Sequence, residues 1–322
     1  MVLTPAIFGK VSVYPLADES LGVRSMALGV ETPDTTILLD AGVSLAPKRY
    51  RLPPHPEEFS AARDARRRIL EFAKSCEVVT ISHFHLDHYT PSYISYYEWA
   101  NPEVFEATYA GKTVVVKRPD NTVSYNQRRR AAVVLGQLGQ LGCKVMEAEN
   151  ANITIGSTRV TALGPFPHGS GEFMGCVMVF CIENGDQKLV YAPDVQGPVD
   201  RRTTEILASL KPTLLVIGGP PTYLEGYRVE QVSVEAGLEN LATLAKVTSV
   251  VISHHMLREL NWREKLEKVG IINFHTYAGI AGLSEKCLEA RRRQLYVEKP
   301  PSTRFREWLE KYQSGLREPP PI

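Results

Sequence analysis

Four side chains that commonly bind metal ions stand within the six residues from His83 to His88. They follow the apolar run Val78 to Ser82, which has the composition of a buried strand in a central sheet. His83 and His85 are two residues apart, so in an extended chain their rings project to the same side and can hold one ion. Asp87 and His88 come next, where we expect the chain to turn. Imidazole combined with carboxylate suits Zn²⁺, and also Fe or Mn, so the segment predicts a metal site.

Three further metal-binding side chains stand just after predicted strands in the second half of the chain. Taken alone, each would be interpreted as a surface histidine or a turn-forming aspartate. Their shared position at strand ends groups them with the first segment: His168 follows Arg159 to Leu163, Asp194 follows Lys188 to Ala192, and His254 follows Ser249 to Ser253. His255 competes with His254 for the last position, and we favour His254 because it comes first after the strand.

Short β-rich runs alternate with helical patterns along the whole chain, which favours one large α/β domain over residues 1–322. Within this domain we expect an insertion at residues 89–140 and a charged, helical C-terminal extension at residues 283–322. Gly156-Ser157 and Asn184-Gly185 are typical of hairpin turns between strands. The elements that must position the candidate ligands are therefore strands of a layered fold.

The composition limits the classes of partner. Lys and Arg number 37 against 36 Asp and Glu, a formal charge of +1, which argues against coating long nucleic acid or anionic membrane. No run approaches the roughly eighteen apolar residues of a membrane span. The first residues lack the pattern of a secretory signal, and the five scattered cysteines form no C-x-x-C pair. We therefore expect a cytoplasmic protein that has neither a membrane nor long nucleic acid as a partner.

Taken together, these motifs resemble the metallo-β-lactamase superfamily, and within it an archaeal branch. The resemblance covers about Ala6 to Gly282 and rests on the histidine segment, on the three later ligand positions, and on Leu38 to Gly42 as an early strand and turn. It implies an α/β fold, namely an αββα sandwich of two mixed β-sheets flanked by helices. The metal site would lie at one edge, between the two sheets.

The resemblance also implies two divalent metal ions, with Zn²⁺ as the first choice. One ion would be held by His83, His85 and His168, the other by Asp87, His88 and His254, with Asp194 bridging them. A carboxylate can bridge two ions where a neutral imidazole cannot. Asp40 is expected to form a turn, to which Gly42 contributes, or to orient a metal-bound histidine.

A di-metal site of this type lowers the pKa of a bound water toward about 7, so that hydroxide can attack a carbonyl carbon or a phosphorus. Asp87 is the natural residue to orient this nucleophile or to collect its proton, and His255 could reach the substrate or carry a proton. The sequence thus predicts a metal-dependent hydrolase of a small molecule or a short phosphodiester. Two alternatives stay open. One is a hydrolase of a lactone, thioester or other carbonyl ester, and the other is a metal-stabilised binding or regulatory protein without turnover.

Four runs of arginine bear on the choice of substrate: Arg66 to Arg68, Arg128 to Arg130, Arg201 to Arg202, and Arg291 to Arg293. We expect such runs to form solvated helix faces. The second run follows Tyr125, and guanidinium groups beside an aromatic ring suit phosphate or nucleotide. A site mouth lined by this run would favour a phosphodiester, whereas an apolar slot would favour a carbonyl ester. The loop from Gly218 to Tyr223 either borders the site or forms a rigid turn.

Overall fold

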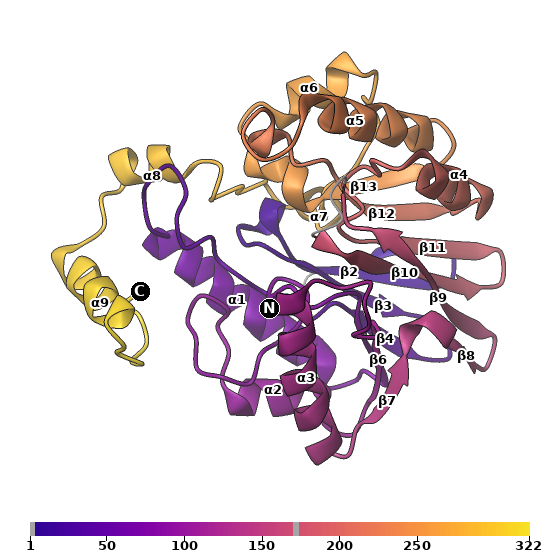
Figure 1. The fold of residues 1–322 in the computed structure, drawn as a ribbon, viewed down its shortest axis with the longest axis horizontal. Coiled ribbons are helices and arrows are strands. Elements are labelled where there is room, and N and C mark those ends of the chain that lie inside the picture. The colour runs from indigo at the N-terminus through magenta and orange to yellow at the C-terminus, as the bar shows by residue number, and fades with distance from the viewer. Residues whose placement is uncertain (1–3, 170–173) are drawn as a thin grey trace.

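Two β-sheets packed face to face form the centre of the protein, and helices cover the outer face of each sheet (Figure 1). The computed structural model describes residues 4–169 and 174–322. The first sheet has seven strands in the order β1 to β7, and the second has six in the order β13-β12-β11-β10-β9-β8. Both sheets contain parallel and antiparallel pairs. The predicted αββα sandwich of two mixed sheets is confirmed.

The first sheet and its helices come from the N-terminal half of the chain. Its strands pair antiparallel from β1 to β4 and parallel from β4 to β7. The elements are β1 (Ala6–Phe8), β2 (Val11–Asp18), β3 (Met26–Glu31), β4 (Thr36–Leu39), α1 (Pro56–Ala73), β5 (Val78–Ile81), α2 (Pro102–Tyr109), β6 (Thr113–Val116), α3 (Tyr125–Gln140) and β7 (Lys144–Glu147).

The second sheet and its helices follow in the C-terminal half. The elements are β8 (Asn152–Ile155), β9 (Thr158–Pro167), β10 (Cys176–Asn184), β11 (Gln187–Ala192), α4 (Arg201–Ser209), β12 (Leu214–Gly218), α5 (Gln231–Ala245), β13 (Ser249–Ser253), α6 (Trp262–Lys268) and α7 (Tyr277–Ile280). Both predicted hairpins are present: β8 pairs antiparallel with β9, and β10 with β11. The first connection consists of Gly156-Ser157, and the second begins after Asn184, which pairs with Gln187.

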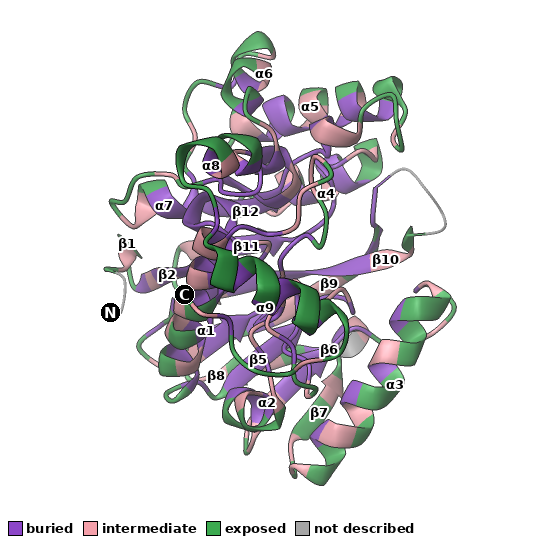
Figure 2. Cartoon of the chain, turned by 90° about the vertical axis from the view of Figure 1, so that its left-hand side faces the viewer, coloured by how far each residue is buried: buried purple, intermediate pink, exposed green. Residues whose placement is uncertain are grey.

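Three layers of buried apolar side chains hold the sandwich together. The central layer lies between the sheets and contains Leu39 of β4 and Phe180 of β10. The layer under the first set of helices contains Leu38 and Phe59, and the layer under the second set contains Leu241. Leu38 and Leu39 enter different layers because successive side chains of a strand point to opposite faces. Accordingly, the strands between the helices are mostly buried (Figure 2).

The two segments predicted as additions to the fold lie in different places. Residues 89–140 contain α2, β6 and α3, and β6 pairs with β5 and β7 within the sheet. Residues 283–322 contain α8 (Arg292–Glu298) and α9 (Thr303–Gln313), and α9 lies across α1 (Figure 2). Trp308 of α9 packs edge-on against Phe59 of α1, with 5.3 Å between the ring centroids. In the described ranges, no helix is long and apolar enough to cross a membrane.

Two of the arginine runs are not simply solvated helix faces, and that prediction is wrong for one member of each. Arg66 is 1% exposed and donates hydrogen bonds to the Ala41 carbonyl oxygen at 2.8 Å and to Thr90 Oγ1 at 2.6 Å. Arg292 is fully buried, and its Nη2 donates to Glu58 Oε1 at 2.7 Å. A guanidinium has five donors in a rigid fork, so each side chain can connect several loops from inside the protein.

Candidate metal centre

The candidate ligands follow strands of both sheets at one edge of the sandwich. Strands β9, β11 and β13 run in the same direction within the second sheet, so their carboxyl ends lie at the same edge. The segment from His83 to His88 follows β5 of the first sheet and faces them. β9 extends to Pro167, four residues beyond the predicted end of this strand, because Phe166 and Pro167 still pair with β10. His168 therefore follows β9 directly. His254 likewise follows β13 directly, and Asp194 stands two residues after the end of β11.

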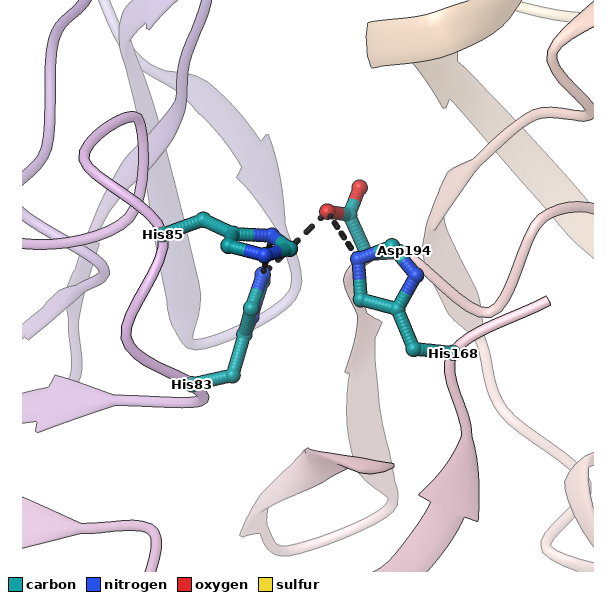
Figure 3. Close-up of side chains that lie close together, drawn as sticks. All are labelled: His83, His85, His168 and Asp194. Atoms are coloured by element: carbon teal, nitrogen blue, oxygen red, sulfur yellow. Dashed lines mark hydrogen bonds and ion pairs between the residues drawn. The ribbon is translucent and has the colours of Figure 1, made fainter. Parts of the chain in front are cut away.

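The first group of side chains contains His83, His85, His168 and Asp194 (Figure 3). One potential ligand atom from each residue lies within 4.8 Å of the others. The Oδ2 atom of Asp194 is 3.3 Å from His83 Nε2 and 3.0 Å from His168 Nε2. His83 Nε2 lies 3.0 Å from His85 Nδ1. The two histidines of the first sheet thus point across the interface toward the histidine and the carboxylate of the second.

The second group contains Asp87, His88 and His254, again within 4.8 Å of one another. His254 Nε2 lies 3.4 Å from Asp87 Oδ2 and 3.4 Å from His88 Nε2. Asp194 also reaches this group, because its Oδ2 is 3.3 Å from His88 Nε2 and its Oδ1 is 3.1 Å from His254 Nε2. The structure therefore brings all seven sequence-predicted ligands together, with Asp194 between the two groups.

The donor set fits divalent metal ions. Asp194 is 1% exposed, and its Oδ1 accepts no hydrogen bond from the residues that the structure describes. An unpaired buried carboxylate is costly unless a proton donor or a cation compensates it. Five imidazoles and two carboxylates offer the nitrogen and oxygen ligands that Zn²⁺, Fe and Mn accept. Two cations bound at these groups would compensate the buried carboxylates and coordinate the lone pairs of the histidine nitrogens.

Asp40 holds His88 in the orientation that a ligand needs. Its Oδ2 accepts a hydrogen bond from His88 Nδ1 at 2.8 Å, which directs the Nε2 of the same ring at Asp194, 3.3 Å away. Asp40 Oδ1 accepts from the Ser82 backbone N–H at 2.8 Å, at the end of β5. Of the two roles expected for Asp40, the structure thus supports orientation of a histidine.

The role predicted for Gly42 needs correction. Its backbone does not adopt a left-handed conformation, whereas Asp40, two residues earlier, has φ of +49°. A Cβ atom on Gly42 would lie 2.2 Å from the backbone nitrogen of His88. The position therefore requires glycine because the histidine segment passes directly against it.

Glu19 contacts the ring of His254 as Asp40 contacts that of His88, and so orients it. No pattern in the sequence indicated this role. Glu19 Oε2 lies 3.3 Å from His254 Nδ1, although the residues are 235 positions apart. Arg258 fixes this carboxylate by donating from Nε to Oε1 at 2.7 Å. Glu19 stands in the short turn after β2, among polar residues with no ligand-like spacing, so only the folded arrangement identifies it.

His254 and His255 differ in which ring nitrogen is free. The Nδ1 of His255 lies 3.0 Å from Nη1 of Arg258, which can only donate, so the proton of a neutral His255 belongs on Nε2. That Nε2 lies 3.6 Å from Asp194 Oδ1. His254 instead directs its Nε2 at two carboxylates, Asp194 Oδ1 at 3.1 Å and Asp87 Oδ2 at 3.4 Å, with Arg258 Nη2 at 3.0 Å, and this position supports His254 as the ligand. Tyr223 lies 3.4 Å from His255 Nδ1 through its hydroxyl, so the loop from Gly218 to Tyr223 borders the site.

Buried charges of opposite sign set the protonation of the cluster. Burial, together with the nearby His88, lowers the pKa of His83 to about 4. Burial opposes protonation of His254 too, but the carboxylates of Asp194 and Glu19 raise its pKa to about 9. Burial alone would raise the pKa of Asp194, yet the surrounding histidines hold it well below its ordinary range. The carboxylate stays ionised, so the site requires positive charge from protons or from metal ions.

The run from Arg128 to Arg130 does not line the candidate metal centre. Arg129 and Arg130 instead line a cavity between α3 and the loop after the histidine segment, and none of the seven candidate ligands lines that cavity. Among the described groups that border the metal centre are His255, Tyr223 and Arg258.

Comparison with known proteins identifies the family and the fold of the chain. Residues 23–234 match the family model described as "Beta-lactamase superfamily domain". The chain is 43% identical over 296 residues to a UPF0282 protein of Pyrobaculum neutrophilum, covering 89% of this chain and 94% of that protein. It is 40% identical over 290 residues to a UPF0282 protein of Methanopyrus kandleri, covering 89% and 99%. A possible metal-dependent hydrolase from Veillonella parvula shares the fold, with a TM-score of 0.51 at 12% identity, over 85% of this chain and 96% of that one.

Proposed function

Since this chain belongs to the metallo-β-lactamase superfamily, in its archaeal UPF0282 branch, we propose that it is a hydrolase that works with two divalent metal ions. The observation that carries the proposal is the position of Asp194, which contacts histidines of both ligand groups. A binding protein would not need two adjacent groups that share one carboxylate. Zn²⁺ is the first choice for both ions, with Fe or Mn as alternatives that suit the same donors.

In this proposal each ion has its own histidines. One would be held by His83, His85 and His168, the other by Asp87, His88 and His254, and Asp194 would be shared. Ions bound there would supply an activated water at neutral pH and would polarise the bond under attack.

The residues around the ligands position the reaction. Burial would raise the pKa of Asp87, but His254, His88 and Arg258 hold it well below its ordinary range, so the carboxylate remains ionised. Nη2 of Arg258 lies 3.3 Å from Asp87 Oδ2 and fixes its direction. Of the two roles expected for Asp87, these contacts favour orienting the attacking water over collecting its proton. His255, with its Nε2–H facing the cluster, is suited to donate a hydrogen bond to the oxygen on which negative charge develops.

We place a small phosphodiester ahead of a carbonyl ester as the substrate. Arg49 lies on the Tyr223 ring, 4.6 Å from its centroid, and Nη2 of Arg49 donates to the Arg258 carbonyl oxygen at 3.0 Å. Within residues 4–169 and 174–322, no carboxylate forms an ion pair with Arg49. A positive group on the Tyr223 ring, whose hydroxyl lies near His255, favours a substrate that carries negative charge. The substrate we expect is a small molecule or a short phosphodiester.

The test compares two chromogenic substrates on the metal-loaded protein. Bis(4-nitrophenyl) phosphate should be turned over and 4-nitrophenyl acetate should be turned over more slowly, and chelation should abolish both reactions. Asp87→Asn should lower kcat by about 10²-fold or more, because a positioned carboxylate is lost. Asp186→Asn, an exposed aspartate in the turn between β10 and β11, is the matched control and should keep wild-type turnover.

Three outcomes would count against the proposal. Wild-type turnover by metal-loaded Asp87→Asn would remove Asp87 from the reaction. A protein that holds two ions and turns over neither substrate would favour the alternative of a metal-stabilised binding or regulatory protein. Preference for the acetate would move the assignment to a carbonyl ester.

A further inference from the structure

A cavity of about 310 Å³ lies between α3 and the loop that follows the histidine segment. Its lining includes Tyr89, Tyr93, Asn126, Arg129, Arg130 and Val133. This volume is at the lower end of the range for small-molecule sites. Because none of the candidate ligands lines it, the cavity is separate from the metal centre.

The cavity joins an apolar wall to a cationic one. Tyr93 is 49% exposed and Val133 is 58% exposed, so both present apolar surface to whatever enters. The guanidinium groups of Arg129 and Arg130 line the cavity from the same helix, α3, four and three residues before Val133. Aromatic surface beside arginine recognises a flat ring that carries an anionic group.

The arginines of this cavity differ from the other arginine runs in their partners. Arg67 pairs with Asp64 at 3.2 Å, Arg201 with Glu205 at 3.1 Å, and Arg292 with Glu58 at 2.7 Å. For Arg128, Arg129 and Arg130, the described part of the chain offers no carboxylate within 4.0 Å. Among the described residues, Arg129 and Arg130 therefore line the cavity without an acidic partner, and a bound anion would compensate their charge.

We propose that this cavity binds a small organic anion with a planar ring, of the class of a nucleoside monophosphate. The ring would lie against Tyr93 and Val133, and the phosphate would be held by Arg129 and Arg130. This site goes beyond the proposed hydrolysis and does not depend on it, since it uses none of the ligands of the metal centre.

The bound anion would lie next to the backbone that carries the ligands. Nη1 of Arg130 donates a hydrogen bond at 3.2 Å to the carbonyl oxygen of Phe84, which stands between His83 and His85. Tyr89, at the base of the cavity, follows His88 directly and is 2% exposed. An anion bound in the cavity would therefore compete with the Phe84 carbonyl oxygen for Arg130.

Calorimetric titration of the full-length, metal-loaded protein with AMP tests the proposal. AMP should bind with one site per chain, and adenosine or inorganic phosphate alone should bind at least about tenfold more weakly, because each keeps only one of the two contacts. Arg129→Gln should weaken AMP binding about tenfold through loss of a charge-assisted hydrogen bond. Arg128→Gln is the matched control, since Arg128 is exposed on the same helix but does not line the cavity, and it should bind AMP like the wild type.

Val133→Glu provides a second variant that leaves every arginine in place. A carboxylate at this exposed position would repel the phosphate and should also weaken binding about tenfold or more. Unchanged affinity in both Arg129→Gln and Val133→Glu would place the AMP elsewhere, the metal centre included, and would overturn the proposal. Equal losses in Arg128→Gln and Arg129→Gln would overturn it too, because they would indicate only general attraction to a positive helix. Absence of AMP binding by the wild type would also contradict it.

Discussion

Asp194 lies among five imidazole rings and contacts a different set with each carboxylate oxygen. Its backbone has φ of +48°, and Asp40 and His254 have φ of +49° and +66°. Residues other than glycine rarely adopt this left-handed conformation, and it concentrates at functional sites where the surrounding structure holds it. Three residues that direct their side chains into one cluster thus have an unfavourable backbone conformation.

At this scale, local spacing indicated the first four candidate ligands, and Asp40 was expected to orient a histidine, but the sequence did not indicate the residues behind His254. The segment from His83 to His88 can be recognised as a metal-binding motif because its four candidate ligands are neighbours in sequence. Glu19 and Arg258 act on His254 from different parts of the chain, and each looks like an ordinary charged residue in its own segment. Which residues lie behind a ligand depends on packing between distant segments, and periodicity contains no information about that.

The pair His254 and His255 gives a matched test of the ligand assignment. His254→Gln should reduce metal content from two ions per chain to one, because the second group loses an imidazole while the first stays complete. His255→Gln should keep both ions and lose turnover, because only the Nε2–H donor is removed. Metal content after equilibrium dialysis, measured by mass spectrometry beside kcat, checks both. The reverse pattern, with one ion in His255→Gln and two in His254→Gln, would exchange the roles.

At the scale of elements, the ends of strands position the chemistry. Strands β5, β9, β11 and β13 were predicted from apolar runs and hairpin signals, and each precedes a candidate ligand. No single stretch of sequence showed that β5 of the first sheet lies opposite β9, β11 and β13 of the second. This arrangement came from the resemblance to a known family, because alternation along a strand defines the faces of that strand but not which sheet covers it.

The C-terminal segment offers an element-scale prediction about stability. Arg292 of α8 is buried and forms two hydrogen bonds with Glu58 of α1, at 2.7 and 2.8 Å. Arg292→Ala would leave the Glu58 carboxylate buried without its partner, so the free energy of unfolding should fall by about 3–5 kcal/mol. Arg291→Ala is the control, because its side chain is 41% exposed and its pair with Glu298 spans 3.7 Å. It should change stability by less than about 1 kcal/mol.

Urea denaturation of the two variants measures both values. A loss below about 1 kcal/mol for Arg292→Ala would show that the contact between α8 and α1 contributes little to the fold. The buried Glu58 carboxyl would then have to be protonated in the variant, because burial raises its pKa while Arg292 lowers it.

For the molecule as a whole, the candidate metal centre lies between the two halves of the sandwich. The ligands of the first group come from both sheets, as Figure 3 shows for His83 and His85 opposite His168 and Asp194. The sequence predicted this layered architecture from alternating strands and helices, together with the family resemblance. It did not reveal the cavity beside α3, because a cavity depends on how side chains of α3 and the loop after His88 fail to fill the space between them.

Metal removal should therefore loosen the contact between the halves. Ions that bind the folded chain stabilise it by mass action, by about 4 kcal/mol when their concentration is a thousand times Kd. For a chain of this size, chelation should lower Tm by about 5 °C or more, and added Zn²⁺ should restore it. Calorimetric scans of the native, chelated and reloaded protein measure the shift. Identical Tm values in all three would contradict a centre that connects the two sheets.

Anomalous diffraction from crystals of the metal-loaded protein tests directly whether the chain holds two ions at this site. We expect two anomalous peaks, one coordinated by His83, His85 and His168 and the other by Asp87, His88 and His254, with Asp194 in contact with both. A single peak, or peaks coordinated by other residues, would contradict it.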